Sequence, residues 1–316
     1  MTPERQEHEH EPSREPVERT PVAERAVQRA HGGRAKRVLA MQRTVGNRAV
    51  SGAIARDAFG SPTRTLARKP IQIFQVWQEQ RTAGLGVYQG VASFQFEFVA
   101  NECVLTIKVR VTPGKHVTAA EVSQVQTDTE AAFLRLWDEK FYFDDAKSLE
   151  RFFLRVKVEW VKKGQHISIL LLKGKGRDDQ KKWFTQSLPE DRAHEMSHTL
   201  GLRDEYIDTT AVNRRKATSK GVFQDHSIMG DYYTEGVGLA EVKLRHGQAL
   251  ANRIGKASKR KLTAGYTGTY QGERLVRWRG IRDTAKTAGN AAAEAAASAE
   301  IAAIESDMMI PALLTP

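Results

Sequence analysis

The chain has 316 residues, 40% of them hydrophobic and 28% charged, which is enough to bury a sizeable core. No apolar run approaches the roughly 18 residues of a membrane-spanning helix, and residues 1–20 lack the apolar stretch of a signal peptide. A single cysteine, Cys103, excludes an internal disulfide, which fits a chain made in a reducing cytoplasm. Export from the cell would therefore need another route.

The first 69 residues predict a polar tail. Residues 1–30 are rich in Glu, Arg and Pro and bury too little apolar surface to fold, so we expect them to be disordered. Residues 36–55 place apolar side chains at loosely helical spacing and predict a short amphipathic helix. Residues 60–70, "GSPTRTLARKP", have the composition of a linker.

One part of this tail, "MQRTVGNRAV" (residues 41–50), resembles a segment found on many bacterial proteins encoded beside extracellular contractile injection systems. The resemblance implies an address for cargo, read by the tube or the loading proteins of such a system. It also implies synthesis in the bacterial cytoplasm followed by delivery to a target cell or release. The alternative is a helix that packs on the main domain or on itself.

The globular part is expected to begin near residue 70. Phe94, Phe96 and Phe98 alternate with polar residues, and the apolar run at 103–111 follows closely, so the two segments predict a β-hairpin. Thr118, with Glu121 three residues later, predicts the capped start of a helix that ends near Phe141.

Two further strands are predicted at 154–160 and 167–172, joined as a hairpin through "KKGQ". Together with the preceding segments they predict an α+β fold, in which a twisted mixed sheet carries a helix on one face.

The motif "HEMSHTLGLRDEY" (residues 194–206) dominates the rest of the sequence. Positions i and i+4 of a helix share one face, so His194 and His198 can point at one zinc ion, with a coordination position left for water. Glu195 is then placed as a general base toward that water. The alternatives are a polar helix face without metal and a purely structural zinc site.

Three later residues strengthen the motif. Gly201 stands where a left-handed glycine would stop the helix. Asp204 follows three residues on, where the returning chain could present a third ligand. Met229 lies about twenty-five residues downstream, in "HSIMGDYY".

This pattern is similar to the metzincin peptidases, whose signature H-E-x-x-H-x-x-G-x-x-H is followed by a methionine turn. Aspartate in place of the third histidine resembles the small snapalysin-like members. The resemblance implies a zincin-type sheet with an active-site helix, the ligands His194, His198 and Asp204, and Met229 as an apolar floor. Some metzincins bind metal through a tyrosine two residues after the methionine. Here Asp231 occupies that position and the tyrosine, Tyr232, is three residues after Met229. We therefore expect Tyr232 to stabilise an oxyanion and not to bind the metal.

Residues other than Asp204 could also be the third metal ligand. Its rivals are Glu205, His226 and His246, and Asp204 could instead accept a hydrogen bond from a ligand histidine.

The segment before the motif also has two interpretations. In metzincins an edge strand there binds extended substrate, which would place Trp183, Phe184, Thr185 and Gln186 in the cleft. A surface loop is the alternative.

After the motif, we expect loops over 206–235, a helix over 241–254, a strand with one solvated face at 272–283 and an Ala-rich helix at 290–305. Residues 241–286 hold twelve Lys and Arg against three acidic residues. This stretch could contact nucleic acid, but no nucleic-acid motif accompanies it, and a solvated face is the simpler interpretation. We therefore divide the chain into a tail (1–69), a metallopeptidase domain (70–260) and a C-terminal basic and helical segment (261–316).

The sequence thus predicts a zinc endopeptidase that acts on peptides or proteins, delivered as an effector or toxin. Two other classes stay open. One is a metal-stabilised binding component of an injection apparatus without catalytic activity. The other is a nucleic-acid-binding protein that uses the basic stretch at 241–286.

Overall fold

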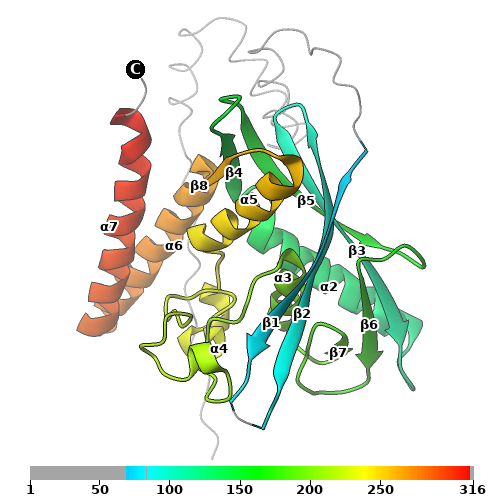
Figure 1. Cartoon of the computed structure of the whole chain (residues 1–316). Helices are drawn as coiled ribbons and strands as arrows, with labels where there is room; N and C mark the ends of the chain where they lie inside the picture. Colours follow the sequence, from blue (N-terminus) through cyan, green and yellow to red (C-terminus); the bar gives the residue numbers. More distant parts are fainter. Residues whose placement is uncertain (1–68, 83, 314–316) are drawn as a thin grey trace, which may run out of the picture. The chain divides into compact units, whose positions relative to one another are not determined.

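The computed structural model describes residues 69–82 and 84–313 (Figure 1). The predicted tail, its helix at 36–55 and the cargo-like segment at 41–50 lie outside the described residues, apart from Lys69. Within the described part of the chain, no helix is both long and apolar enough to cross a bilayer.

The fold is α+β and is built on one mixed, twisted sheet (Figure 1). Its main path runs β1 (Ile71–Gln80), β2 (Val87–Val99), β3 (Glu102–Pro113), β5 (Arg151–Trp160), β4 (Phe141–Asp145) and β8 (Leu262–Tyr266). Two shorter strands, β6 (Ile167–Leu172) and β7 (Lys182–Phe184), extend the sheet beside the far end of β3.

The first predicted hairpin is confirmed, because β2 and β3 pair antiparallel with Phe96 opposite Leu105. The second is wrong. β5 and β6 both run parallel to β3 and occupy successive stretches of it, from Glu102 to Val109 and from Val109 to Pro113. The turn between them therefore carries the chain along one edge of β3 instead of folding it back.

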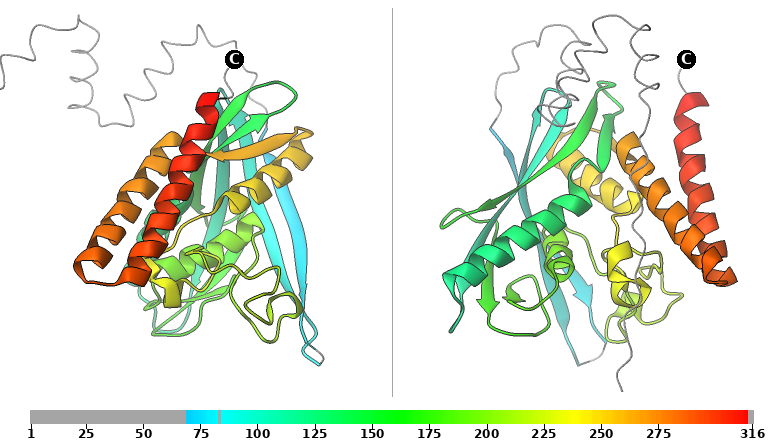
Figure 2. Two further views of the ribbon diagram at one scale, coloured as in Figure 1. Left: turned by 90° about the vertical axis from the view of Figure 1, so that its left-hand side faces the viewer. Right: turned by 180° about the vertical axis from the view of Figure 1, so that it is seen from behind.

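Helix α2 (Ala119–Trp137) covers one face of the sheet (Figure 2). The predicted capping box is present, since Thr118 Oγ1 accepts from the Glu121 backbone and Glu121 accepts from the Thr118 backbone. The helix ends at Trp137, earlier than predicted, because Glu139 adopts a left-handed φ of 62° and Phe141 begins β4. Phe133, Trp137 and Phe141 are fully buried in the main core.

The C-terminal part combines a helix on the core, an edge strand and a helical hairpin. The predicted helix α5 (Leu244–Ser258) forms without a break at Gly247, where an added Cβ would lie 2.5 Å from the Phe141 ring. Strand β8 then pairs with β4, so the sheet continues past residue 260.

The expected strand at 272–283 is wrong, because these residues belong to helix α6 (Gly268–Thr287). Leu275, Trp278 and Ile281 recur every three residues and pack on the Ala-rich helix α7 (Ala291–Leu313), which was predicted as a helix (Figure 2). Packing against the long Ala-rich helix α7 thus outweighs the local pattern of residues 272–283, which had suggested a strand.

Candidate metal centre

The motif begins in the last turn of helix α3 (Pro189–Ser197), and its second histidine opens the 3-10 turn (His198–Leu200) that continues the helix. Pro189 opens the helix and Asp191 accepts from the Leu188 backbone. Its inner face is fastened to α2, since Trp137 Nε1 donates to Ser197 Oγ over 3.0 Å and Arg192 Nε donates to Thr129 Oγ1 over 2.8 Å.

The predicted stop at Gly201 is confirmed by a left-handed φ of 87°. A second constraint acts here, because a Cβ on Gly201 would lie 2.2 Å from the Arg253 guanidinium carbon. Arg253 Nη2 also donates to the Gly201 carbonyl over 3.0 Å. Any other residue at 201 would therefore strain the backbone and displace the arginine that caps the helix.

Both motif histidines have their outer ring nitrogen bonded to a backbone carbonyl. His194 Nδ1 lies 2.7 Å from the Ile228 oxygen, and His198 Nδ1 lies 2.9 Å from the Leu202 oxygen. A carbonyl oxygen can only accept a hydrogen bond, so each Nδ1 must carry the hydrogen. In a neutral ring, Nε2 then has a lone pair that can accept a hydrogen bond or bind a metal ion. These backbone contacts are of the kind that orient metal-binding histidines.

Asp204 faces both lone pairs. Its Oδ1 lies 3.1 Å from His194 Nε2 and 3.2 Å from His198 Nε2. A tetrahedral zinc ion with ligands at about 2.0–2.1 Å holds those ligand atoms about 3.3 Å apart, so both distances from Asp204 to the imidazoles match a zinc site. Burial opposes protonation of His198, but the charge of Asp204 outweighs it and raises the pKa of His198. The centre therefore attracts positive charge.

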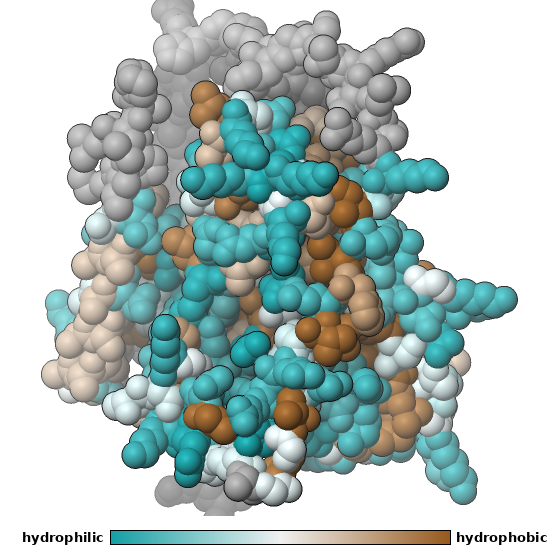
Figure 3. Space-filling view, in the orientation of Figure 1, coloured by the Kyte–Doolittle hydropathy of each residue, from teal (hydrophilic) through white to brown (hydrophobic). Residues whose placement is uncertain are grey.

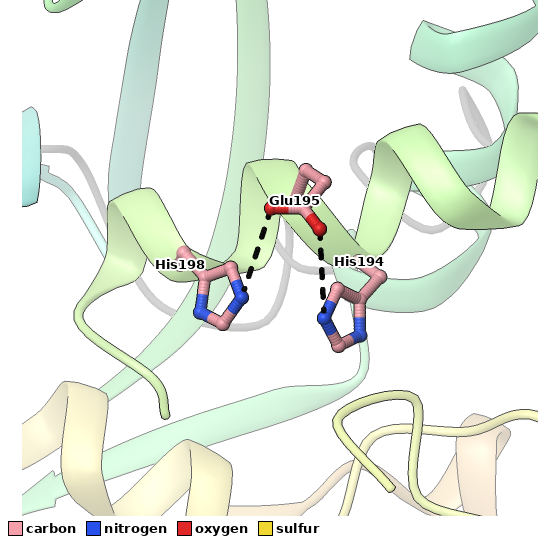
Figure 4. A group of neighbouring side chains, drawn as sticks. All are labelled: His194, Glu195 and His198. Carbon is pink, nitrogen blue, oxygen red and sulfur yellow. Dashed lines mark ion pairs between the residues drawn. The ribbon is translucent and has the colours of Figure 1, made fainter. Parts of the chain in front are cut away.

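Glu195 lies beside the group formed by His194, His198 and Asp204, farther from both imidazoles than Asp204 is. Its Oε1 is 3.9 Å from His194 Nε2 and its Oε2 is 3.8 Å from His198 Nε2 (Figure 4). His194, Glu195 and His198 could themselves hold an ion, but Asp204 Oδ1 is nearer to both imidazoles. Burial, opposed by His194, raises the pKa of Glu195 to about 8 before any cation is present. A carboxyl whose pKa lies near neutral pH can both accept and release a proton, as acid–base catalysis requires.

The rivals of Asp204 lie elsewhere. Glu205 accepts from Arg245, Ser227 and His246, while the His226 ring packs 5.1 Å from the Trp278 ring. Asp204 is thus the carboxylate that the fold brings to the two Nε2 atoms.

The methionine segment is a turn that touches the centre. Gly230 N donates to the Ser227 oxygen over 2.9 Å, and the carbonyl that His194 uses belongs to Ile228 in the same turn. Met229 is fully buried, and its own carbonyl accepts from Glu205 N over 2.7 Å. The segment therefore links His194 to the chain just after Asp204.

Tyr232 packs beside His194 with ring centroids 5.8 Å apart. Its hydroxyl donates to Asp191 Oδ1 over 2.8 Å, and its pKa is raised by burial and by that carboxylate. To stabilise an oxyanion, the hydroxyl would first have to leave Asp191.

The expected cleft residues are only partly suited to that role. β7 is an edge strand that pairs with β6 alone among the described strands, as the interpretation requires. Trp183, however, is fully buried in the main core, so its side chain does not line a surface cleft. Thr185 Oγ1 accepts from Gly174 N, Phe184 is half-buried and Gln186 is exposed.

Several aromatic and cationic neighbours of the centre were not predicted. The Trp77 ring on β1 lies 5.9 Å from the His198 ring and 5.6 Å from the Tyr88 ring on β2. The Tyr206 ring lies 6.5 Å from the His194 ring, and its hydroxyl accepts from Arg177 over 3.2 Å. Burial raises the pKa of Tyr206 to about 12. Only pairing of distant segments brings these residues together, so no local pattern marks them.

A cleft of about 720 Å³ borders the centre on the Asp204 side. Its walls come from β1, from the segment 201–223 and from α5, and Glu195 is not among its lining residues. The face that carries β1 is mostly hydrophilic, with apolar residues in small separate patches (Figure 3).

Part of the basic stretch at 241–286 is paired with carboxylates within the fold. Lys243, Arg274 and Arg277 all pair with the buried Glu241, and Arg245 pairs with Glu205 and Asp225. These four basic residues therefore join α5, α6 and the segment before α5 to buried or half-buried carboxylates of the domain. The expectation that nucleic acid is not a partner stays a prediction.

Comparisons of this chain with protein-family models, curated proteins and solved structures gave no match. The metzincin and injection-system resemblances therefore remain predictions that rest on the residues quoted above.

Proposed function

We propose that this chain is a zinc-dependent endopeptidase, with His194, His198 and Asp204 as ligands and Glu195 as general base. One observation carries the proposal. The Oδ1 atom of Asp204 lies 3.1 Å and 3.2 Å from the two imidazole Nε2 atoms, and the Glu195 carboxylate lies 3.8–3.9 Å from the same atoms. Three buried acceptors need a cation or protons between them, since acceptors alone repel.

Zinc, when bound, would act as a Lewis acid that polarises the peptide carbonyl and lowers the pKa of an attacking water. The protein's own residues supply the rest. Glu195 accepts the proton of the attacking water and then donates it to the leaving nitrogen. The Ile228 and Leu202 carbonyls keep both imidazoles in the tautomer that presents Nε2 to the centre.

The test is peptide cleavage by the full-length, zinc-loaded chain, measured by mass spectrometry on a mixed peptide library. Glu195→Gln should keep zinc but lower the cleavage rate about 10²–10⁴-fold, the usual contribution of a general base. Glu190→Gln is the matched control on the same helix, because Glu190 pairs with Arg135 and not with the motif histidines. It should cleave like the unmodified chain.

Equal rates for Glu195→Gln and the unmodified chain would remove Glu195 from the mechanism. A zinc-loaded chain that cleaves nothing in the library would favour the metal-stabilised binding component.

Delivery as an effector is a separate part of the proposal and rests on residues 41–50 alone. Deleting these ten residues should abolish co-purification with an injection-system tube while leaving peptide cleavage unchanged. Retained loading after the deletion would contradict the cargo role.

A further inference from the structure

The second carboxylate oxygen of Asp204 points away from the imidazoles and meets an arginine. Arg214 Nη2 donates to Asp204 Oδ2 over 3.3 Å, and both side chains are buried. Oδ1 takes the imidazole side and Oδ2 the arginine side, so this contact fixes the rotation of the carboxylate. Without it, Oδ2 would be a buried acceptor with no donor among the described residues, and the carboxylate would lose the contact that fixes its rotation.

The guanidinium group of Arg214 is fixed by several further contacts. Its Nε and Nη2 donate to the two oxygens of Glu79 over 2.7 and 2.8 Å, and its Nη1 donates to the Tyr206 carbonyl over 2.8 Å. The Tyr206 ring lies 4.8 Å from the guanidinium carbon. Glu79 stands on β1 and is only 3% exposed. The arginine thus links an N-terminal strand to the candidate third ligand.

We propose that Arg214 is a positioning residue for the metal centre, anchored by Glu79, which sets the orientation of Asp204 and thereby the zinc affinity. The proposal rests on the proposed zinc site. It adds a dependence that the motif does not contain, because a strand more than a hundred residues upstream, β1, becomes part of the metal-binding apparatus.

Two physical arguments separate this role from simple stabilisation. Replacement of a whole buried ion pair by apolar residues often costs little stability, because desolvation offsets most of the Coulomb attraction; only the loss of one partner is strongly destabilising. The geometry also requires arginine in particular. The planar fork reaches both oxygens of Glu79 while the second Nη2 hydrogen reaches Asp204, whereas a lysine ammonium is a single point of donation.

The chain offers a matched control in Arg245. It makes the same two-bond contact with Glu205, the neighbour of Asp204, through Nε over 2.8 Å and Nη2 over 2.6 Å. It has no contact with Asp204. Arg245→Lys therefore disrupts a fork of the same kind one residue away from the candidate ligand.

The experiment compares full-length Arg214→Lys, Arg245→Lys and Glu79→Gln with the unmodified chain. Urea unfolding of the metal-free proteins measures stability, chelator competition measures the zinc Kd, and the visible spectrum of the cobalt-substituted proteins reports ligand geometry. We expect both lysine variants to lose stability. Only Arg214→Lys should weaken zinc binding by about 10–100-fold, the range for loss of an outer-sphere partner, and shift the cobalt spectrum. Glu79→Gln should weaken zinc binding less.

Equal zinc affinity and cobalt spectra in Arg214→Lys and Arg245→Lys would overturn the positioning role while leaving the zinc site intact. Failure of the unmodified chain to bind zinc would overturn both this inference and the proposed function. A chain that binds zinc but cleaves no peptide would overturn only the peptidase assignment, and the affinity comparison would still decide the role of Arg214.

Discussion

Asp204 and Glu205 are adjacent carboxylates, each 9% exposed and each in contact with histidine and arginine, yet their surroundings differ in one respect. Around Glu205 every neighbour is a donor. Lys243 N donates to His246 Nδ1 over 3.1 Å, so the hydrogen of a neutral His246 sits on Nε2, which donates to Glu205 over 3.1 Å. The Ser227 hydroxyl and Arg245 add further donors.

Around Asp204 the imidazoles are turned the other way. Their Nδ1 atoms donate to carbonyls, so their Nε2 atoms meet the carboxylate as acceptors. With a neutral His246, the first cluster pairs every donor with an acceptor, whereas the second needs a proton or a cation between Asp204 and the imidazoles. The partner of Nδ1 is therefore the feature by which the candidate metal centre at Asp204 differs from the histidine–carboxylate contact at Glu205.

The largest expected effect is on zinc affinity, when the carboxylate at position 204 or at position 205 is replaced by its amide. Asp204→Asn should weaken zinc binding by more than the roughly 10–100-fold that an outer contact costs, because its amide nitrogen can turn toward the Nε2 atoms and cannot ligate zinc. Glu205→Gln should keep the zinc affinity of the unmodified chain. Chelator competition measures both, and similar losses in the two variants would erase the distinction between the clusters.

A smaller effect concerns stability. Glu205→Gln should lower the free energy of unfolding by about 1.5–3 kcal/mol, since it replaces charged hydrogen bonds from Arg245 and Ser227 with neutral ones. Urea unfolding of the metal-free protein measures this loss. A change below about 0.5 kcal/mol would mean that the Glu205 cluster does not hold the segment after Asp204 in place.

The smallest effect comes from a third buried carboxylate, Asp178. Its Oδ1 accepts from Phe184 N and Ser187 Oγ, but its Oδ2 has no hydrogen-bond partner among the described residues. Burial raises the pKa of Asp178 to about 6, against about 3.9 unfolded. A raised folded pKa gives stability that is present below about pH 4 and lost as the pH rises through about 6.

Asp178→Asn removes this titration. The variant should therefore gain on the order of 1–2 kcal/mol over the unmodified chain at pH 7.5, and nothing at pH 4. Urea unfolding at the two pH values provides the measurement. The same difference at both would show that ionisation of Asp178 does not affect folding.

Local patterns predicted local structure well. The alternating Phe94, Phe96 and Phe98, the Thr118 cap and the stop at Gly201 all stand as expected, because each depends on contacts within a few residues. The i and i+4 spacing of His194 and His198 belongs to the same class. It places two Nε2 atoms on one side of a helix irrespective of the rest of the fold.

Long-range pairing was beyond such patterns. The successive parallel contacts of β5 and β6 along β3 are a property of the sheet and not of either strand. The contact of Arg214 with Glu79 joins residues 135 positions apart, and neither has a distinctive sequence neighbourhood. The segment at 272–283 became a helix because α7 packs against it. In each case the deciding partner is remote in the sequence.

The most direct test is the zinc content of the full-length chain, purified without chelators and measured by elemental analysis beside His198→Ala and His246→Ala. These two variants remove one buried histidine from each cluster. We predict about one zinc per chain in the unmodified protein and in His246→Ala, and none in His198→Ala. The absence of zinc from the unmodified chain, or its retention in His198→Ala, would contradict the assignment of the metal centre.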